Sequence, residues 1–389
     1  MADRHAWIEE GAHFVAPGVH RIPLPLPSDG LRAVNVYAIE AGSGLVLIDS
    51  GWALANALDQ LKRSLAAIGA GLPDVRRFLV THMHRDHYTQ AVEVRRLFGA
   101  PIALGEGEKP SIDGLLSGDF RPLRAQLAIL RAAGAALIAD RLTELTSGIR
   151  APQEPAAGPG SGGERFGGLS FDPLSPGSPA WRPGTTVGAA LGYEAPDEWI
   201  SGQQTFDIDS RTLTAVETPG HTRGHVVFAD AEARLLFAGD HVLPHITPSI
   251  GFQEAPSAEP LREYLQSLSV VRGLPDMRLL PAHGPVSPST HARIDELTEH
   301  HAQRLRIMAD VLSGGERTGY EVALSVAWTS RQRELGELDL MNQMLAVCET
   351  VYHLDLLAAQ GAAVSQAGED GIRRYRLPMP PAASAPVED

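Results

Sequence analysis

Short apolar runs alternate with segments of helical periodicity along the first part of the chain. In the segment 88–98, the apolar residues Ala91, Val94, Leu97 and Phe98 recur every three or four positions, as in a helix with one buried face. The predicted strands are residues 34–40, 45–48, 78–81 and 102–104, and the predicted helices are residues 52–68 and 88–98. Strands that alternate with helices predict the α/β fold class.

The same alternation returns after a long middle segment. Residues 109–148 have helical periodicity, whereas residues 151–188 are dense in proline and glycine and predict irregular structure. Further strands are predicted at residues 212–217, 234–238 and 278–280, with a helix at residues 260–272. A β-rich and then helical pattern that occurs twice predicts a four-layer αββα sandwich, with loops from both halves meeting at one edge.

The pattern changes after Pro288. An amphipathic helix is predicted over residues 290–312, followed by shorter helices and a hairpin-like segment that ends in RRYRL. We therefore expect a domain of residues 1–288, with an insert at about 105–195, and a C-terminal domain of residues 289–389. The apolar face of residues 340–357 is predicted to be core.

Five segments place metal-binding side chains where a predicted strand ends: LVLIDSG, THMHRDH, TPGHTRGH, LFAGDH and LLPAHGP. The residues concerned are Asp49, His82, His84, Asp86, His87, His221, Asp240 and His283. Imidazole and carboxylate groups are the ligands that divalent ions such as zinc prefer. Because Cys348 is the only cysteine, the site is of the His/carboxylate type, which suits a catalytic ion with an open position.

The order Asp, HxHxDH, His, Asp, His resembles the metallo-β-lactamase fold superfamily, and the TPGHTRGH and GDH contexts resemble its glyoxalase II and LACTB2-like branch. The resemblance implies that His82, His84 and His221 hold one metal ion, that Asp86, His87 and His283 hold a second, and that Asp240 bridges the two. It implies an orienting role for Asp49. The C-terminal segment resembles the winged-helix extension of LACTB2-like proteins.

We expect a hydrolase whose cofactors are two Zn²⁺ ions, with iron or manganese as alternatives, and whose catalytic carboxylates are Asp49, Asp86 and Asp240. Two ions about 3.5–4 Å apart can share a water and lower its pKa to about 7. The expected reaction is attack of that bridging hydroxide on a thioester or other activated acyl compound. The alternatives are a metal-dependent ribonuclease or phosphodiesterase, a mono-iron sulfur dioxygenase, and a metal-containing winged-helix regulator that binds DNA.

Composition narrows the choice of partners. The formal net charge of −14 disfavours binding to nucleic acid or an anionic membrane, and a compact basic cluster occurs at Arg373, Arg374 and Arg376. No apolar stretch has membrane-spanning length, and residues 1–14 lack the apolar centre of a signal peptide, so a cytoplasmic location is expected. The expected partner is a small acyl substrate. Homo-oligomerisation stays open.

Several other residues carry weaker expectations. His225 is predicted to support the site or to pack beside it without binding metal, and a structural or a substrate role is open for His241. His245, His300, His301 and His353 are interpreted as ordinary polar residues. The insert is expected to form either a lid over the substrate or a lobe anchored by its aromatic residues, which are Phe120, Phe166, Phe171, Trp181, Tyr193 and Trp199.

Overall fold

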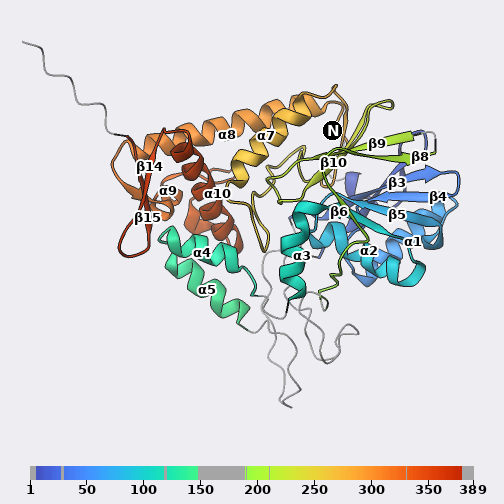
Figure 1. Ribbon diagram of the computed structural model, residues 1–389, viewed down its shortest axis with the longest axis horizontal. Helices are drawn as coiled ribbons and strands as arrows, with labels where there is room; N and C mark the ends of the chain where they lie inside the picture. The colour runs from blue at the N-terminus through green and yellow to red at the C-terminus, as the bar shows by residue number, and fades with distance from the viewer. Residues whose placement is uncertain are drawn as a thin grey trace, which may run out of the picture. The chain divides into compact units, whose positions relative to one another are not determined.

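A computed structural model of the protein describes residues 6–27, 30–117, 121–147, 189, 191–209, 211–329 and 331–378. The chain divides into two compact units (Figure 1). The first comprises residues 1–125 and 144–299, and the second comprises residues 126–143 and 300–389. The sequence-based domain boundary at 288/289 stays a prediction.

The first unit contains a seven-stranded sheet whose spatial order follows the chain. Its strands are β1 (His13–Ala16), β2 (Val19–Pro25), β3 (Ala33–Ala41), β4 (Gly44–Ile48), β5 (Val75–Val80), β6 (Ile102–Gly105) and β7 (Glu198–Ile200). Neighbours are antiparallel from β1 to β4 and parallel from β4 to β7. Because β4 and β5 are parallel, the residues that follow them emerge at the same edge of the sheet.

A second sheet of five strands has the order β12-β11-β10-β9-β8. Its strands are β8 (Gln204–Ile208), β9 (Arg211–Glu217), β10 (Val226–Asp230), β11 (Leu235–Gly239) and β12 (Arg278–Pro281). Only the β11–β12 pair of this sheet is parallel. That pairing brings the residues after β11 and β12 to one edge, as β4 and β5 do in the first sheet.

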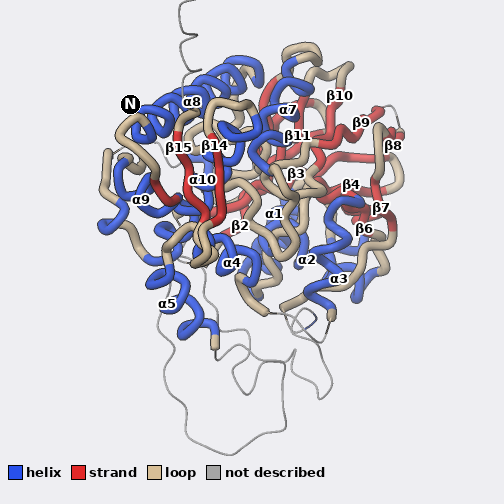
Figure 2. Tube along the Cα trace, turned by 60° about the vertical axis from the view of Figure 1, so that its left-hand side comes forward, coloured by secondary structure: helices blue, strands red, loops and turns tan. Residues whose placement is uncertain are grey.

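Both faces of the first sheet are buried, which explains why its central strands read as continuous apolar runs. Phe78 and Val80 of β5 pack in a core with the helices, whereas Leu79 faces Phe228 and Phe237 in a core between the two sheets. Helices α1 (Ala55–Ala67), α2 (Arg85–Phe98) and α3 (Lys109–Leu116) lie beside β4–β6 in Figures 1 and 2. The first unit is therefore a mixed α/β sandwich, as predicted.

Helix α7 (Pro260–Arg272) packs on the loops of the second sheet. The Tyr264 hydroxyl donates a hydrogen bond to the His241 carbonyl at 3.0 Å, and the Ser267 hydroxyl donates one to the Pro219 carbonyl at 2.8 Å. Helix α8 (Thr290–Leu312) follows β12, and the boundary between the units falls inside it, between residues 299 and 300.

The second unit combines helices with a small antiparallel sheet of order β13-β15-β14. Its elements beyond α8 are α4 (Arg124–Ala132, of which residues 126–132 belong to this unit), α5 (Ala136–Thr146, of which residues 136–143 belong to this unit), β13 (Arg317–Thr318), α9 (Gly319–Ser325), α10 (Leu340–Ala359), β14 (Val364–Ala367) and β15 (Arg373–Arg376). The predicted core face of α10 is confirmed, because residues such as Met344, Val347 and Leu354 are buried.

Two histidines of the second unit differ from their interpretation as ordinary polar residues. His301 and His353 are both buried, with His301 Nδ1 3.1 Å from His353 Nε2. They belong to no group with metal-binding geometry among the described residues. Their pairing is long-range in sequence, so helical spacing within α8 could not reveal it.

Part of the predicted insert lies outside the described residues, including Phe120, Phe166, Phe171 and Trp181. Tyr193 is buried in the core of the first unit and stacks on Tyr88, with ring centroids 5.9 Å apart. Trp199 belongs to β7 and packs against the same core. For these two residues, anchoring of the chain to the sandwich is the role that their contacts support. Among the described helices, none has the length and apolar character needed to cross a membrane.

Candidate metal centre

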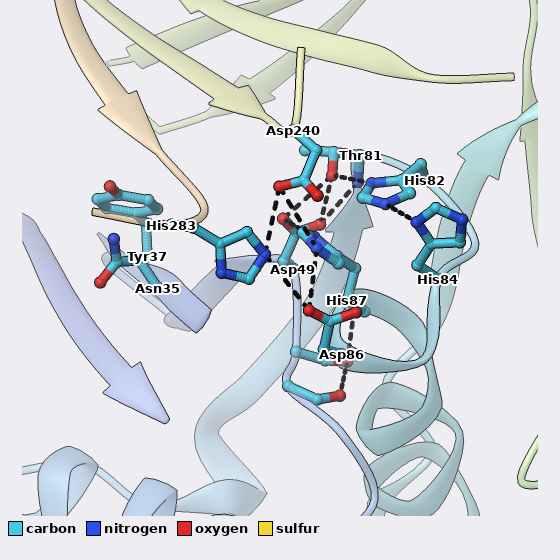
Figure 3. A network of polar contacts seen from close by, with 12 residues as sticks. Asn35, Tyr37, Asp49, Thr81, His82, His84, Asp86, His87, Asp240 and His283 are labelled. Atoms are coloured by element: carbon cyan, nitrogen blue, oxygen red, sulfur yellow. Dashed lines mark hydrogen bonds and ion pairs between the residues drawn. The ribbon is translucent and has the colours of Figure 1, made fainter. Parts of the chain in front are cut away.

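The structure brings seven candidate residues into two adjoining groups at one edge of the sandwich, with Asp49 hydrogen-bonded to one of them, His87. Figure 3 shows this site except for His221, which lies in the loop between β9 and β10. Asp49 follows β4, residues 82–87 follow β5, Asp240 follows β11 and His283 follows β12. Asp49 has a φ of 58°, a left-handed conformation that Asp tolerates better than most residues and that is often found at functional sites.

Three imidazoles form the first group, which we call the three-histidine group. His82 Nε2 lies 2.9 Å from His84 Nδ1 and 3.3 Å from His221 Nε2, and His221 Nε2 lies 3.1 Å from His84 Nδ1. Asp240 Oδ2 is 3.5 Å from His221 Nε2. Because each ring turns one nitrogen toward the same point, the group has the donor set of a metal site.

The second group, which we call the two-histidine group, contains His87, His283 and Asp86. His283 Nε2 lies 3.3 Å from Asp86 Oδ2 and 3.4 Å from Asp240 Oδ1. His87 Nε2 lies 3.6 Å from Asp86 Oδ2 and 3.7 Å from Asp240 Oδ1. Asp240 thus turns one oxygen toward each group, which is the arrangement of a carboxylate shared by two cations.

The donor atoms of the two-histidine group fit a cation on independent grounds. His87 Nε2, His283 Nε2 and Asp240 Oδ1 are buried and have no hydrogen bond of normal geometry among the described residues. Such atoms are rare in folded proteins and require an explanation, of which a bound ion is one. Three such atoms directed at one point, beside the complete three-histidine group, fit a site for two divalent ions.

Backbone carbonyls fix the outward nitrogens of three histidines. His84 Nε2 donates to the Phe252 carbonyl at 2.7 Å and His221 Nδ1 donates to the Ser249 carbonyl at 2.6 Å, so one loop orients two rings of the three-histidine group. His283 Nδ1 donates to the carbonyl of Ala33 at 2.8 Å. A hydrogen bond at the outer nitrogen of an imidazole sets the tautomer that leaves the inner nitrogen free to bind.

Asp49 stands behind the site, outside both groups. Its carboxylate accepts hydrogen bonds from His87 Nδ1 at 2.9 Å, from the Thr81 backbone N–H at 2.8 Å and from the Thr81 hydroxyl at 3.0 Å. The Thr81 oxygen in turn lies 3.1 Å from His82 Nδ1. One carboxylate therefore orients a ring of the two-histidine group directly and a ring of the three-histidine group through Thr81.

The two groups differ in charge. Burial, together with the neighbouring imidazoles, lowers the pKa of His82 well below its ordinary value and lowers the pKa of His221 to about 4. Burial would also lower the pKa of His87 and of His283, but neighbouring carboxylates raise these pKa values to about 10 and about 9. The carboxylates are Asp86, Asp49 and Asp240 for His87, and Asp240 and Asp86 for His283. Without metal, the three-histidine group is neutral and the two-histidine group carries protons near neutral pH.

His225 and His241 lie near the site without joining either group. His225 Nε2 accepts the backbone N–H of Asp240 at 3.2 Å, and its Nδ1 lies 2.8 Å from the Thr218 hydroxyl. His225 thus supports Asp240, as its predicted role required. His241 is buried against Tyr264, with ring centroids 5.3 Å apart, and its position favours the structural alternative.

The glycines of TPGHTRGH act in two different ways. Gly220 has a φ of 134°, and a Cβ there would lie 2.5 Å from the Tyr264 Cα. Gly224 needs no special φ, but a Cβ there would lie 2.2 Å from the Glu108 backbone nitrogen. Gly220 therefore permits a tight bend, whereas Gly224 is required by close packing. Glu108 and Thr81 were not predicted from the sequence, although the glycines of GEGE that precede Glu108 are a signal of close backbone approach.

Comparison with known proteins agrees with this geometry. Residues 29–283 match the Metallo-beta-lactamase superfamily, and the chain belongs to that superfamily. Its members are mostly metal-dependent hydrolases. All eight candidate residues lie within the matched stretch.

Among curated proteins, the chain is 32% identical over 143 residues to the beta-lactamase-like protein 2 homolog of Caenorhabditis elegans, which is 36% of this chain and 46% of that protein. It is 35% identical over 113 residues to the lactamase-like protein nscB of Neosartorya fischeri, which is 29% of this chain and 32% of that protein. The matched stretches thus span less than half of either relative. The first of these is a LACTB2-like homologue, as the sequence predicted.

Two solved structures resemble the chain over most of its length. A metallo-beta-lactamase family protein from Thermus thermophilus has a TM-score of 0.67 at 23% identity, covering 93% of this chain and 99% of that one. A beta-lactamase domain protein from Burkholderia ambifaria has a TM-score of 0.68 at 24% identity, covering 94% and 93%. Identities this low establish a common fold and leave the activity open.

Proposed function

We propose that the protein is a hydrolase that uses two divalent metal ions, with zinc as the leading metal. The observation that carries the proposal is the position of Asp240, whose Oδ2 faces the three-histidine group and whose Oδ1 faces the two-histidine group. A mono-iron oxygenase would need one of these groups, and the completeness of both favours the two-metal hydrolase.

The residues around the centre would hold, orient and shield it. Two divalent ions bound there would lower the pKa of a water molecule and polarise a carbonyl or phosphoryl oxygen. Asp240 would keep both ions at one separation, while Asp49 would keep His87 in the tautomer whose Nε2 faces inward. A water molecule activated by the bound ions would serve as nucleophile, so no serine or cysteine nucleophile would be required.

The site opens to solvent beside Asp86. The Asp86 side chain is 18% exposed and His84 is partly exposed, whereas the side chains of His82 and His87 are inaccessible. A substrate would therefore approach from the Asp86 and His84 side. Asp86 is the carboxylate at this opening best placed to meet a reacting group, which supports its proposed catalytic role.

A thioester or similarly activated acyl compound is the proposed substrate class, and the HTRGH and GDH sequences, which resemble glyoxalase II, support it. The second unit also has the helix–strand–helix–helix–strand–strand order of a winged helix, which we propose as its fold. Its longest helix after α8, α10, contains no lysine or arginine and has most of its residues buried. Since nucleic acid is bound mainly through basic side chains, these features disfavour the ribonuclease and DNA-binding alternatives.

Metal content and turnover measured on one sample would test the proposal. Protein purified without added metal should contain about two zinc ions per chain, as the paired ligand groups require. It should hydrolyse members of a thioester and lactone panel and leave RNA intact. A single iron per chain with oxygen uptake on a thiol persulfide would refute the hydrolase, and RNA cleavage without acyl turnover would refute the substrate class.

A further inference from the structure

Glu108 is a fully buried carboxyl group that the proposed chemistry does not use. It lies in the 3-10 helix Glu106–Glu108, between β6 and α3. Its Oε1 accepts a hydrogen bond from the Thr222 hydroxyl at 2.5 Å. Burial raises the pKa of the carboxyl group to about 7, against the opposing effect of the Thr222 hydroxyl and of the nearby backbone N–H groups of Met83 and Gly224. Its partners thus come from two separate loops.

Those two loops carry the whole three-histidine group. Met83 stands between His82 and His84, and Thr222 follows His221 directly. Residues 83 and 222 are far apart in the sequence, and the loops that contain them extend from different sheets. The Glu108 carboxyl group is therefore a link between the ligand loop of the first sheet and the ligand loop of the second.

The backbone around Glu108 has no room to adjust. A Cβ on Gly105 would lie 1.9 Å from the Gly224 carbonyl oxygen, and a Cβ on Gly107 would lie 2.5 Å from the Arg223 carbonyl oxygen. The GEGE turn and the TRG segment thus touch main chain to main chain. This close packing fixes the position of the Glu108 carboxyl group relative to Thr222.

We infer that Glu108 is a positioning residue that holds the three-histidine group in its metal-binding geometry. The inference rests on the two-metal site proposed above. The residue touches neither group directly, so its action would pass through the backbone of the two loops. Outer groups of this kind typically change metal affinity by about 10–100-fold when they are altered.

Two variants remove the link at opposite ends. Glu108→Gln keeps the size of the side chain but replaces one carboxyl oxygen with an NH₂ group that cannot accept a hydrogen bond. Thr222→Val keeps the shape of the side chain and removes the hydroxyl. Asp230→Asn is a matched control, because Asp230 is a buried carboxylate of β10 in the same unit that pairs with Arg211 and the Ala233 amide and contacts neither ligand loop.

The test is a titration of metal-free protein with Zn²⁺ against a competing chelator, together with the visible spectrum of the Co²⁺-loaded protein. In both E108Q and T222V, one of the two ions should bind about 10–100-fold more weakly and the other should change by less than about threefold. The Co²⁺ spectrum should shift, and the double variant should be no worse than E108Q alone because both changes break one link. D230N should keep both affinities and the spectrum.

Other results would overturn the inference. Unchanged affinity for both ions in T222V and E108Q, or an equal loss at both sites, would show that Glu108 serves the fold alone. Should E108Q fail to fold, the T222V titration decides in the same way. Wild-type protein that bound no Zn²⁺ would overturn the proposed metal centre as well. Normal Zn²⁺ binding in the wild type and in both variants would overturn only the role of Glu108.

Discussion

The Asp49 carboxylate accepts a hydrogen bond from His87 Nδ1 at 2.9 Å, and the opposite nitrogen of the same ring faces Asp86 and Asp240. The backbone of Asp49 adopts a left-handed φ of 58° at this point. A conformation that costs about 1–3 kcal/mol persists where the surrounding contacts enforce it. Here the hydrogen bonds that Asp49 accepts from His87 and Thr81 hold its backbone in this conformation.

Replacement of Asp49 should weaken one metal site more than the other. In Asp49→Asn the oxygen that accepts from His87 can remain, but the negative charge that favours its N–H donor is lost. We expect the affinity of the two-histidine group to fall by about 10–100-fold, with a smaller effect on the three-histidine group through Thr81. Zn²⁺ titration monitors both sites, and equal affinities in the variant and the wild type would contradict the orienting role.

Asp240→Ala should affect both ions at once. Since its two oxygens face different groups, we expect metal content to fall below two ions per chain and turnover to fall by more than about a hundredfold, beyond the usual effect of an outer residue. Circular dichroism should show a folded protein. Asp295→Ala, which removes an exposed carboxylate paired with Arg272, serves as the control. Full activity in Asp240→Ala would exclude a bridging role.

Metal binding should release protons, and the release should come mainly from the two-histidine group. His87 and His283 have pKa values of about 10 and about 9 in the metal-free protein, so both carry a proton at pH 7 that a cation must displace. The pKa of His221 is about 4, so its ring is already neutral. We expect about two protons released on full loading at pH 7, and affinity that rises toward pH 9–10.

Calorimetry in buffers of different ionisation enthalpy measures this proton count. The same raised pKa values affect the stability of the metal-free protein. The contribution of His87 should be complete below its ordinary pKa of 6.5 and should be lost as the pH rises through about 10. Loading without proton release would show that the carboxylates do not keep His87 and His283 protonated at pH 7.

Nucleic-acid binding is expected to be absent at physiological salt. The chain has a net charge of −14, and in β15 Arg373 pairs with Asp355 and Arg374 pairs with Asp370. Paired arginines in an acidic protein offer little attraction for phosphate. Fluorescence anisotropy with labelled RNA and DNA should show no binding at micromolar protein. A salt-dependent complex would restore the ribonuclease or DNA-binding alternatives.

The strand ends and their side chains could be predicted because both are local in sequence. The runs before Asp49, His82 and Asp240 are apolar on both faces, since β4, the end of β5 and β11 are buried on both sides, and the ligands follow at once. The strand β2 escaped prediction because Pro23 and Pro25 interrupt it, and proline is unusual inside a strand. The helix expected from residue 52 begins at Ala55.

The supporting contacts could not be predicted because they join distant parts of the chain. Glu108 meets Thr222 across 114 positions, and His301 meets His353 across 52. No periodicity records such a pair. Spacing also could not reveal that Asp240 divides its oxygens between two groups, because that depends on how the two sheets face each other.

The loop at residues 249–252 determines which substitutions near the site leave its histidine rings in place. It orients His84 and His221 through main-chain carbonyls, which every amino acid possesses. The side chain of Ser249 is therefore free to differ without a change in ring orientation, whereas the Phe252 ring also packs beside His84, with ring centroids 6.0 Å apart, and Gly251 has a φ of 64°. The orientation of the two rings depends on the number of residues in this loop and on the path of its backbone. Deletion of a single residue from this loop should harm the centre more than replacement of either side chain.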